Sequence, residues 1–149
     1  MEKLILLLLA IMLTACSLSA RSEYDQNRSK WESANIPHYR YALFMGCFCP
    51  FMNDMPLEIE VNNGEVVSMT RADGTIVSPA DPLYETASPY STIDRLFASL
   101  KADLGGSADE VTVSYDPTYG YPTNISIDVI KQAVDEELSL QISDFEVLK

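Results

Sequence analysis

The sequence alternates between apolar and polar residues over six short segments, and this pattern most limits the folds open to the chain. A period of two predicts strands whose one face is buried. The six segments are 39–49, 57–61, 65–70, 111–115, 125–129 and 138–147. No crossover helix links the strands within either group of three, so the sheet should be mainly antiparallel.

One amphipathic helix is predicted over residues 91–104, between the two groups of strands. Its apolar stripe consists of Ile93, Leu96, Phe97, Leu100 and Leu104. Ser91 is the expected N-cap, and Gly105-Gly106 closes the end. A short N-terminal helix is expected over 23–34. The predicted fold is therefore α+β: one curved sheet of about six strands with helix 91–104 packed on one face.

Two local irregularities are expected in the sheet. Asn63-Gly64 marks a hairpin, and a two-residue loop would pair Ile59 with Ser68. We favour a three-residue loop that pairs Ile59 with Val67, because that register places the apolar residues on one face. The apolar positions change parity at Ser143-Asp144, which predicts a bulge there.

The N-terminus has the features of an exported, lipid-modified protein. A cationic start and a short apolar run precede Leu13-Thr14-Ala15-Cys16, which resembles a bacterial lipobox. We expect a cleaved signal peptide over 1–15, lipid on Cys16, a tether over 16–22 and one globular domain over 23–149. Acyl chains would hold the protein on a membrane. Ser17 indicates the outer membrane, facing the periplasm, if the host is Gram-negative.

The formal net charge of −12 limits the partners that the chain can take. Nucleic acids and anionic headgroups need Lys and Arg, so no nucleic-acid ligand is expected. The simplest explanation of the acidity is solubility. The sequence indicates no cofactor.

The segment Cys47-Phe48-Cys49 is the one most suited to chemistry. With Cys16 taken by lipid, an oxidising compartment favours a disulfide between Cys47 and Cys49, either structural or redox-active. The alternative is a Cu(I) or thiol-handling site in the Met/Cys cluster 45–55, because thiolates and thioethers select Cu(I). The sulfur residues of this alternative are Met45, Cys47, Cys49, Met52 and Met55.

Three tyrosines, Tyr115, Tyr119 and Tyr121, surround a predicted turn and are candidate binding residues. They could instead pack on the edge of the sheet. The single histidine, His38, lacks the surrounding motif of a hydrolase. An acidic group (Asp128, Asp135, Glu136, Glu137) lacks the spacing of a calcium loop and is read as solvated surface.

The order of several short motifs resembles a family of small bacterial lipoproteins and exported proteins that is catalogued only as a domain of unknown function. The resemblance spans about residues 28–147. It is carried by Trp31, Ile36, Tyr39, Tyr41, Cys47-Phe48-Cys49, 61–66, 92–93, 96–97, 113–116, 120–122, 125–128 and 135–137. It implies an exported setting and assigns no catalytic residues.

From these features we expect a lipid-anchored protein of the cell envelope with a non-enzymatic binding role. Its partners would be the membrane, through the N-terminal lipid, and an envelope protein or component. The expected contact surfaces are the sheet face and the turn at 116–122, which we call the tyrosine turn. An envelope enzyme of another type stays open as a further alternative.

Overall fold

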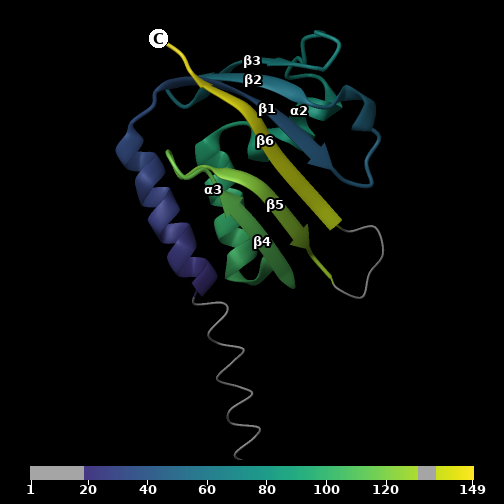
Figure 1. Ribbon diagram of the computed structural model, residues 1–149. Helices are drawn as coiled ribbons and strands as arrows, with labels where there is room; N and C mark the ends of the chain where they lie inside the picture. The colour runs from purple at the N-terminus through teal and green to yellow at the C-terminus, as the bar shows by residue number, and fades with distance from the viewer. Residues whose placement is uncertain (1–18, 131–136) are drawn as a thin grey trace, which may run out of the picture.

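The computed structural model describes residues 19–130 and 137–149, which form one six-stranded antiparallel sheet with helices on one face (Figure 1). The strands are β1 (His38–Gly46), β2 (Leu57–Asn62), β3 (Glu65–Thr70), β4 (Glu110–Tyr115), β5 (Pro122–Asp128) and β6 (Glu137–Val147). Their order across the sheet is β3-β2-β1-β6-β5-β4. The predicted α+β class and the mainly antiparallel sheet are confirmed, and the two groups of strands join where β1 pairs with β6.

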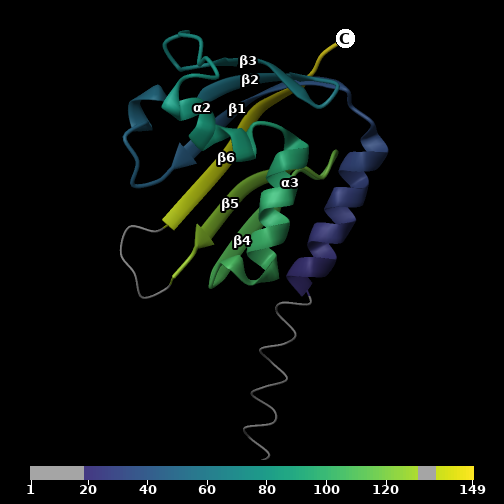
Figure 2. The same ribbon diagram turned by 180° about the vertical axis from the view of Figure 1, so that it is seen from behind.

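The helical layer consists of an N-terminal helix (19–34), α2 (Pro82–Ala87) and α3 (Ile93–Ala102). Short helical turns complete it: η1 (Met52–Asp54), η2 (Ser88–Tyr90) and η3 (Asp103–Ser107). Figure 2 shows α2 and α3 in front of the sheet, with the N-terminal helix beside α3. The N-terminal helix is already formed at residue 19, earlier than predicted, and α2 was not predicted.

Helix α3 follows the predicted apolar stripe but has a different cap. Ile93, Leu96, Phe97 and Leu100 are buried against the sheet. The N-cap is Thr92, whose Oγ1 accepts a hydrogen bond from the Arg95 N–H at 3.1 Å. Ser91 instead donates its hydroxyl to the Ser88 carbonyl at 2.8 Å, so the predicted cap lies one residue too early.

Strand β1 shows the predicted alternation but ends sooner. Its odd-numbered side chains, from Tyr39 to Met45, are buried, and the even-numbered ones are partly exposed. Cys47 and Cys49 lie beyond its end, because a disulfide holds their Cα atoms 5.2 Å apart. Two residues along an extended strand would separate those atoms by roughly 6.5–7 Å, so the backbone must bend after Gly46.

The β2–β3 hairpin corrects both registers considered from the sequence. The loop has two residues, Asn63 and Gly64, both with positive φ (51° and 81°). A bulge in β3 then places Ile59 opposite Met69. The bulge leaves Val67 exposed and returns Met69 to the buried face, so the apolar pattern is satisfied by the bulge and not by a longer loop.

The bulge predicted in the last strand is confirmed. The pairing between β1 and β6 shifts register between Arg40 and Ala42, which lie opposite Glu146 and Ser143. Asp144, within the shifted segment, has a positive φ of 52°. The earlier core residues of β6 lie at even-numbered positions, whereas Phe145 lies at an odd-numbered one. The register shift turns the Phe145 side chain toward the core as well.

Candidate functional site

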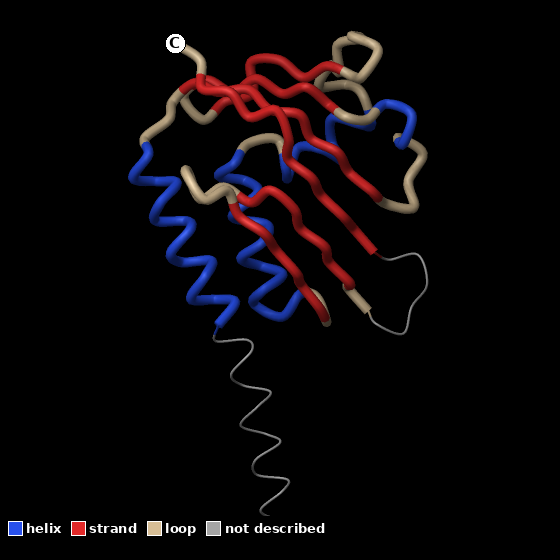
Figure 3. Tube along the Cα trace, in the orientation of Figure 1, coloured by secondary structure: helices blue, strands red, loops and turns tan. Residues whose placement is uncertain are grey.

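The face of the sheet opposite α3 carries two hollows over its strands and is the candidate site. In Figure 3 the strands lie in front of α3 with this face toward the viewer. No helix within 19–130 and 137–149 lies over it, and we call it the open face. Because antiparallel strands place partner residues directly opposite one another, polar side chains of the open face form rows across β4, β5, β6 and β1.

Three rows follow from the observed register. The acidic row is Glu110, Asp128 and Glu137. The hydroxyl row is Thr112, Ser126 and Ser139, and it ends at Gly46 of β1. The amide row is Ser114, Asn124 and Gln141, and it ends at Phe44.

A hollow of about 790 Å³ lies over the end of this surface. Its lining combines the acidic row, the hydroxyl row and the segment 46–48, with Ile127 and Leu138 beneath. A smaller hollow of about 280 Å³ continues over the amide row to Phe44. The open face therefore offers a continuous polar surface with carboxylates at one end.

Gly46 shapes the wall of the hollow. A Cβ atom at this position would collide with the Ser139 hydroxyl oxygen, so a larger residue would require the Ser139 side chain to rotate away. Ser139 donates that hydroxyl to the Gly46 carbonyl oxygen at 3.4 Å. The close approach packs the last residue of β1 against β6.

The segment after Gly46 contains the Cys47–Cys49 disulfide and an exposed aromatic ring. Phe48 between the cysteines is 85% exposed. A ring of so few residues removes little entropy from the unfolded chain, so the bond mainly fixes the local bend. A redox role for this bond stays a prediction.

The structure separates the sulfur residues of the copper alternative. The two cysteine sulfurs are bonded to each other, so they are not thiolates in this state. Met45 and Met55 are core residues, at 1% and 7% exposure, whereas Met52 is exposed. Within the described part of the chain, no group of three His, Cys, Asp or Glu side chains is placed to hold a metal ion.

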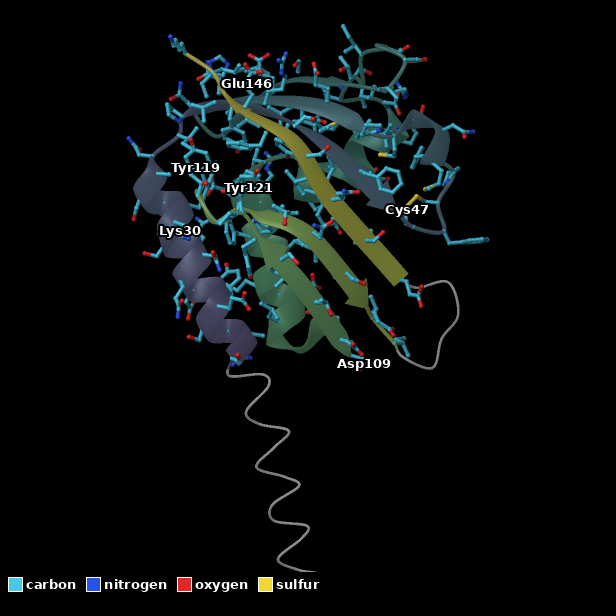
Figure 4. The ribbon with its side chains drawn as sticks, viewed as in Figure 1. Lys30, Cys47, Asp109, Tyr119, Tyr121 and Glu146 are labelled. Atoms are coloured by element: carbon cyan, nitrogen blue, oxygen red, sulfur yellow. A yellow bond between two sulfur atoms is a disulfide. The ribbon has the colours of Figure 1, made fainter. Side chains whose placement is uncertain are left out.

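The three candidate tyrosines lie on the side of the helices, away from the open face. Figure 4 shows Tyr119 and Tyr121 near Lys30 of the N-terminal helix and far from Cys47. The Tyr121 ring stacks on Phe145 at 4.5 Å, and Tyr119 lies 5.8 Å from the same ring. Tyr115 stacks on Phe97 at 6.4 Å.

Burial sets the chemistry of these tyrosines. Burial raises the pKa of Tyr121 to about 12, and it also raises the pKa of Tyr115. The phenols of Tyr115 and Tyr121 therefore ionise even less readily than an ordinary phenol. Tyr121 is only 8% exposed, and Tyr115 and Tyr119 are half-buried, so little of each ring is accessible to a ligand. Their role in binding stays a prediction.

The charged residues at the other end of β1 are paired. His38 Nε2 lies 2.8 Å from Glu60 Oε1. Arg40 lies 2.7 Å from Glu146 and 3.9 Å from Glu58. The hydrogen bond to Glu146 is the main cause that raises the pKa of Arg40. Each basic side chain at this end of the open face therefore has a carboxylate partner, and the three carboxylates outnumber the two basic groups.

The predicted acidic group is only partly visible. Asp135 and Glu136 lie outside the described residues, whereas Asp128 and Glu137 face each other across β5 and β6. Sequence reasoning missed Glu110, which the β4–β5 register adds to them. The alternation of β4 could have identified Glu110, because Glu110 lies on the same polar side of the strand as Thr112 and Ser114.

Cys16 also lies outside the described residues, so the lipid attachment stays an expectation. Among the helices formed by residues 19–130 and 137–149, none combines the length and apolar character that a membrane span requires.

Comparison with known proteins identifies a family. No curated protein matches the chain, and no solved structure does. A family model described as "Family of unknown function (DUF6174)" matches residues 23–147, which is most of the chain. That range contains every strand described above and the whole of the open face. The chain therefore belongs to the DUF6174 family, whose function is unknown.

Proposed function

We propose that this protein is a lipid-anchored binding module of the cell envelope, and that it recognises its partner with the open face of the sheet. One observation carries the proposal: a polar sheet face without a covering helix in the described chain, hollowed by about 790 Å³ beside the acidic row. Concave sites with a few convergent polar groups are typical of ligand binding.

The arrangement of the open face favours binding over hydrolysis. The hydroxyl row supplies hydrogen-bond donors and acceptors, but a serine nucleophile needs an adjacent base. The single histidine of the chain, His38, begins β1, and Gly46 beside Ser139 ends it. Eight residues of extended strand separate His38 from Gly46 by about 26 Å. The distance therefore excludes His38 as a base for Ser139.

The expected anchor would keep the domain near the membrane. The lipobox places the acyl chains on Cys16, and the chain is already helical at residue 19. Three residues reach at most about 11 Å. The end of the N-terminal helix at residue 19 would then face the membrane, and tethering would raise the local concentration of other envelope components.

Site-specific photocrosslinking in cells tests the binding surface. A photoreactive amino acid at Ser126 or Gln141 would lie on the open face, and one at Glu85 or Lys101 would lie on the helical side. We expect the open-face positions to crosslink one partner, identified by mass spectrometry, and the helical positions to give none. Equal crosslinking from both sides, or none from the open face, would contradict the proposal.

The anchor is tested in the same cells with Cys16→Ser. This variant should lose fatty-acid labelling and leave the membrane fraction, because the thiol that carries the lipid is gone. Its circular dichroism should match that of the parent protein. A Cys16→Ser protein that is still labelled would show that the lipid is attached elsewhere.

A further inference from the structure

We infer that the Cys47–Cys49 disulfide oxidises thiols: it takes two electrons from a pair of cysteine thiols in a polypeptide that lies on the open face. This inference rests on the proposed function and names the chemistry of the partner. It begins from the place of the bond. Figure 4 shows Cys47 just beyond the end of β1, and both cysteines are partly exposed.

Structural stabilisation does not account for this bond. Only one residue separates the two cysteines, and closing so short a loop removes little entropy from the unfolded chain. The bond also joins no two strands, because both cysteines lie in the connection between Gly46, which ends β1, and Leu57, which begins β2. Opening the bond therefore breaks no strand pairing, and the disulfide can open and close while the sheet stays folded.

The position of the bond also favours its reduction. A thiolate must reach a sulfur atom to exchange with it, and exposed disulfides are more oxidising than buried ones. The partly exposed Cys47 and Cys49 meet this condition. The bond further requires a bent backbone, because it holds the two Cα atoms 5.2 Å apart. An extended chain would place these atoms roughly 6.5–7 Å apart, so reduction releases a constraint on the backbone.

The residues around the bond favour a polypeptide partner over a small thiol. Phe48, between the cysteines, is 85% exposed, and Met52 in the same connection is 46% exposed. Cysteine is among the most buried residues of folded proteins. A polypeptide whose thiols are still accessible is therefore incompletely folded, and such chains also expose apolar side chains. The Phe48 ring offers these side chains an apolar contact directly beside the disulfide.

The open face would bring an extended polypeptide to the bond. Gly46 pairs with Ser139 and ends the hydroxyl row, and Cys47 follows it directly in the chain. The row crosses four strands, a span of about 14 Å, and its hydroxyls can donate to and accept from backbone amides. A chain that lies along this row therefore ends beside the disulfide.

The exchange balances in two steps. A thiolate of the partner attacks one sulfur of the disulfide: a mixed disulfide forms, the Cys47–Cys49 bond breaks, and the other cysteine leaves as a thiolate. The second thiolate of the partner then attacks the partner's own sulfur in the mixed disulfide and releases the remaining cysteine. The partner loses two electrons and two protons, and both protons end on the sulfurs of Cys47 and Cys49. With Cys16 expected to carry lipid, the chain has no third thiol to intercept the mixed disulfide.

A stoichiometric exchange assay tests this inference on the mature, lipidated protein in neutral detergent. The probe is a reduced synthetic peptide with two cysteines and two phenylalanines among serines, and its control peptide has one cysteine replaced by serine. Acid quenching, alkylation of free thiols and mass spectrometry then count the thiols of both molecules. We expect one oxidised peptide for each protein molecule reduced at Cys47 and Cys49. The control peptide should give only a reversible mixed disulfide.

Three variants locate the activity. Cys47→Ser/Cys49→Ser should oxidise no peptide, yet keep the circular dichroism spectrum and nearly the melting temperature of the parent protein. Phe48→Ala should oxidise the two-cysteine peptide about fivefold more slowly, as expected for losing one aromatic contact. Val67→Ala is its matched control, because Val67 is 55% exposed on the edge strand β3, and it should react like the parent.

Three results would overturn the inference. Millimolar reduced glutathione might open the bond only after urea has unfolded the protein, or the double serine variant might melt at a much lower temperature; either result makes the bond structural. Equal rates for Phe48→Ala and the parent would show that the bond selects no polypeptide. If open-face crosslinking succeeds but no peptide is oxidised, the proposed function stands and the thiol-bearing partner is rejected. If the peptide is oxidised but open-face crosslinking fails, the proposed function and the placement of the partner are rejected.

Discussion

Replacing Trp31 by alanine is expected to lower the free energy of unfolding by about 3–5 kcal/mol. Trp31 is 5% exposed and packs edge-on against Tyr39 at 5.4 Å, Phe145 at 6.0 Å and Tyr121 at 6.4 Å. These rings come from β1, β6 and the tyrosine turn, so the indole joins the N-terminal helix to the centre of the sheet. The cavity left by its removal would be lined by several rings that cannot all move inward.

Urea unfolding followed by circular dichroism measures this effect, since Trp31 is the only tryptophan and its fluorescence is lost in the variant. Phe48→Ala is the control, because that ring is 85% exposed and its loss should change stability by less than about 0.5 kcal/mol. A loss below about 1 kcal/mol for Trp31→Ala would show that the N-terminal helix contributes little to the stability of the sheet.

Local periodicity predicts most of this fold, because burial acts on each segment separately. The alternation of β1 and the stripe of α3 both reflect one apolar face against one core. Registers are harder, because the alternation of β3 is compatible with several pairings and the structure inserts a bulge at Val67. The order of the strands also depends on the β1–β6 pairing, between segments nearly a hundred residues apart, and no local pattern contains it.

The candidate site was less predictable for a related reason. Sequence reasoning selects residues with distinctive chemistry, and it therefore selected the sulfur residues and the tyrosines. Hydroxyls and amides at alternate strand positions are typical of a solvated face. Only the register shows that Thr112, Ser126 and Ser139 share one row and that Glu110 joins Asp128 and Glu137. A surface built from four strands is visible only after those strands are paired.

The loop before β5 shows how the tyrosine turn is held on the N-terminal helix. The Gly120 N–H donates to the Asp116 carbonyl at 2.9 Å, and Asp116 Oδ1 accepts from the Tyr119 N–H at 2.6 Å. Lys30 on the helix donates its ammonium to the Pro117 carbonyl at 3.0 Å. Gly120 has a φ of +81°, and it is buried directly against the helix backbone.

Gly120→Ala is therefore expected to lower the free energy of unfolding by about 2–5 kcal/mol. A left-handed backbone costs an alanine about 1–2 kcal/mol. Crowding adds about 1–3 kcal/mol, because the new Cβ would lie 2.5 Å from the Asn27 carbonyl oxygen and 3.0 Å from the Lys30 Cβ. The Asn27 oxygen belongs to helix backbone, so the loop and the helix must move apart.

Gly74→Ala separates the two contributions in the same unfolding experiment. Gly74 has nearly the same φ, +85°, but no atom lies within 4 Å of the position that a Cβ would take. Gly74→Ala should therefore lower the free energy of unfolding only by the backbone cost of about 1–2 kcal/mol. The difference between the two variants then measures the contact between the tyrosine turn and the N-terminal helix. Equal losses of the free energy of unfolding would mean that the turn and the helix move apart at no measurable cost. The tyrosine turn would then be able to leave the helix when a partner binds.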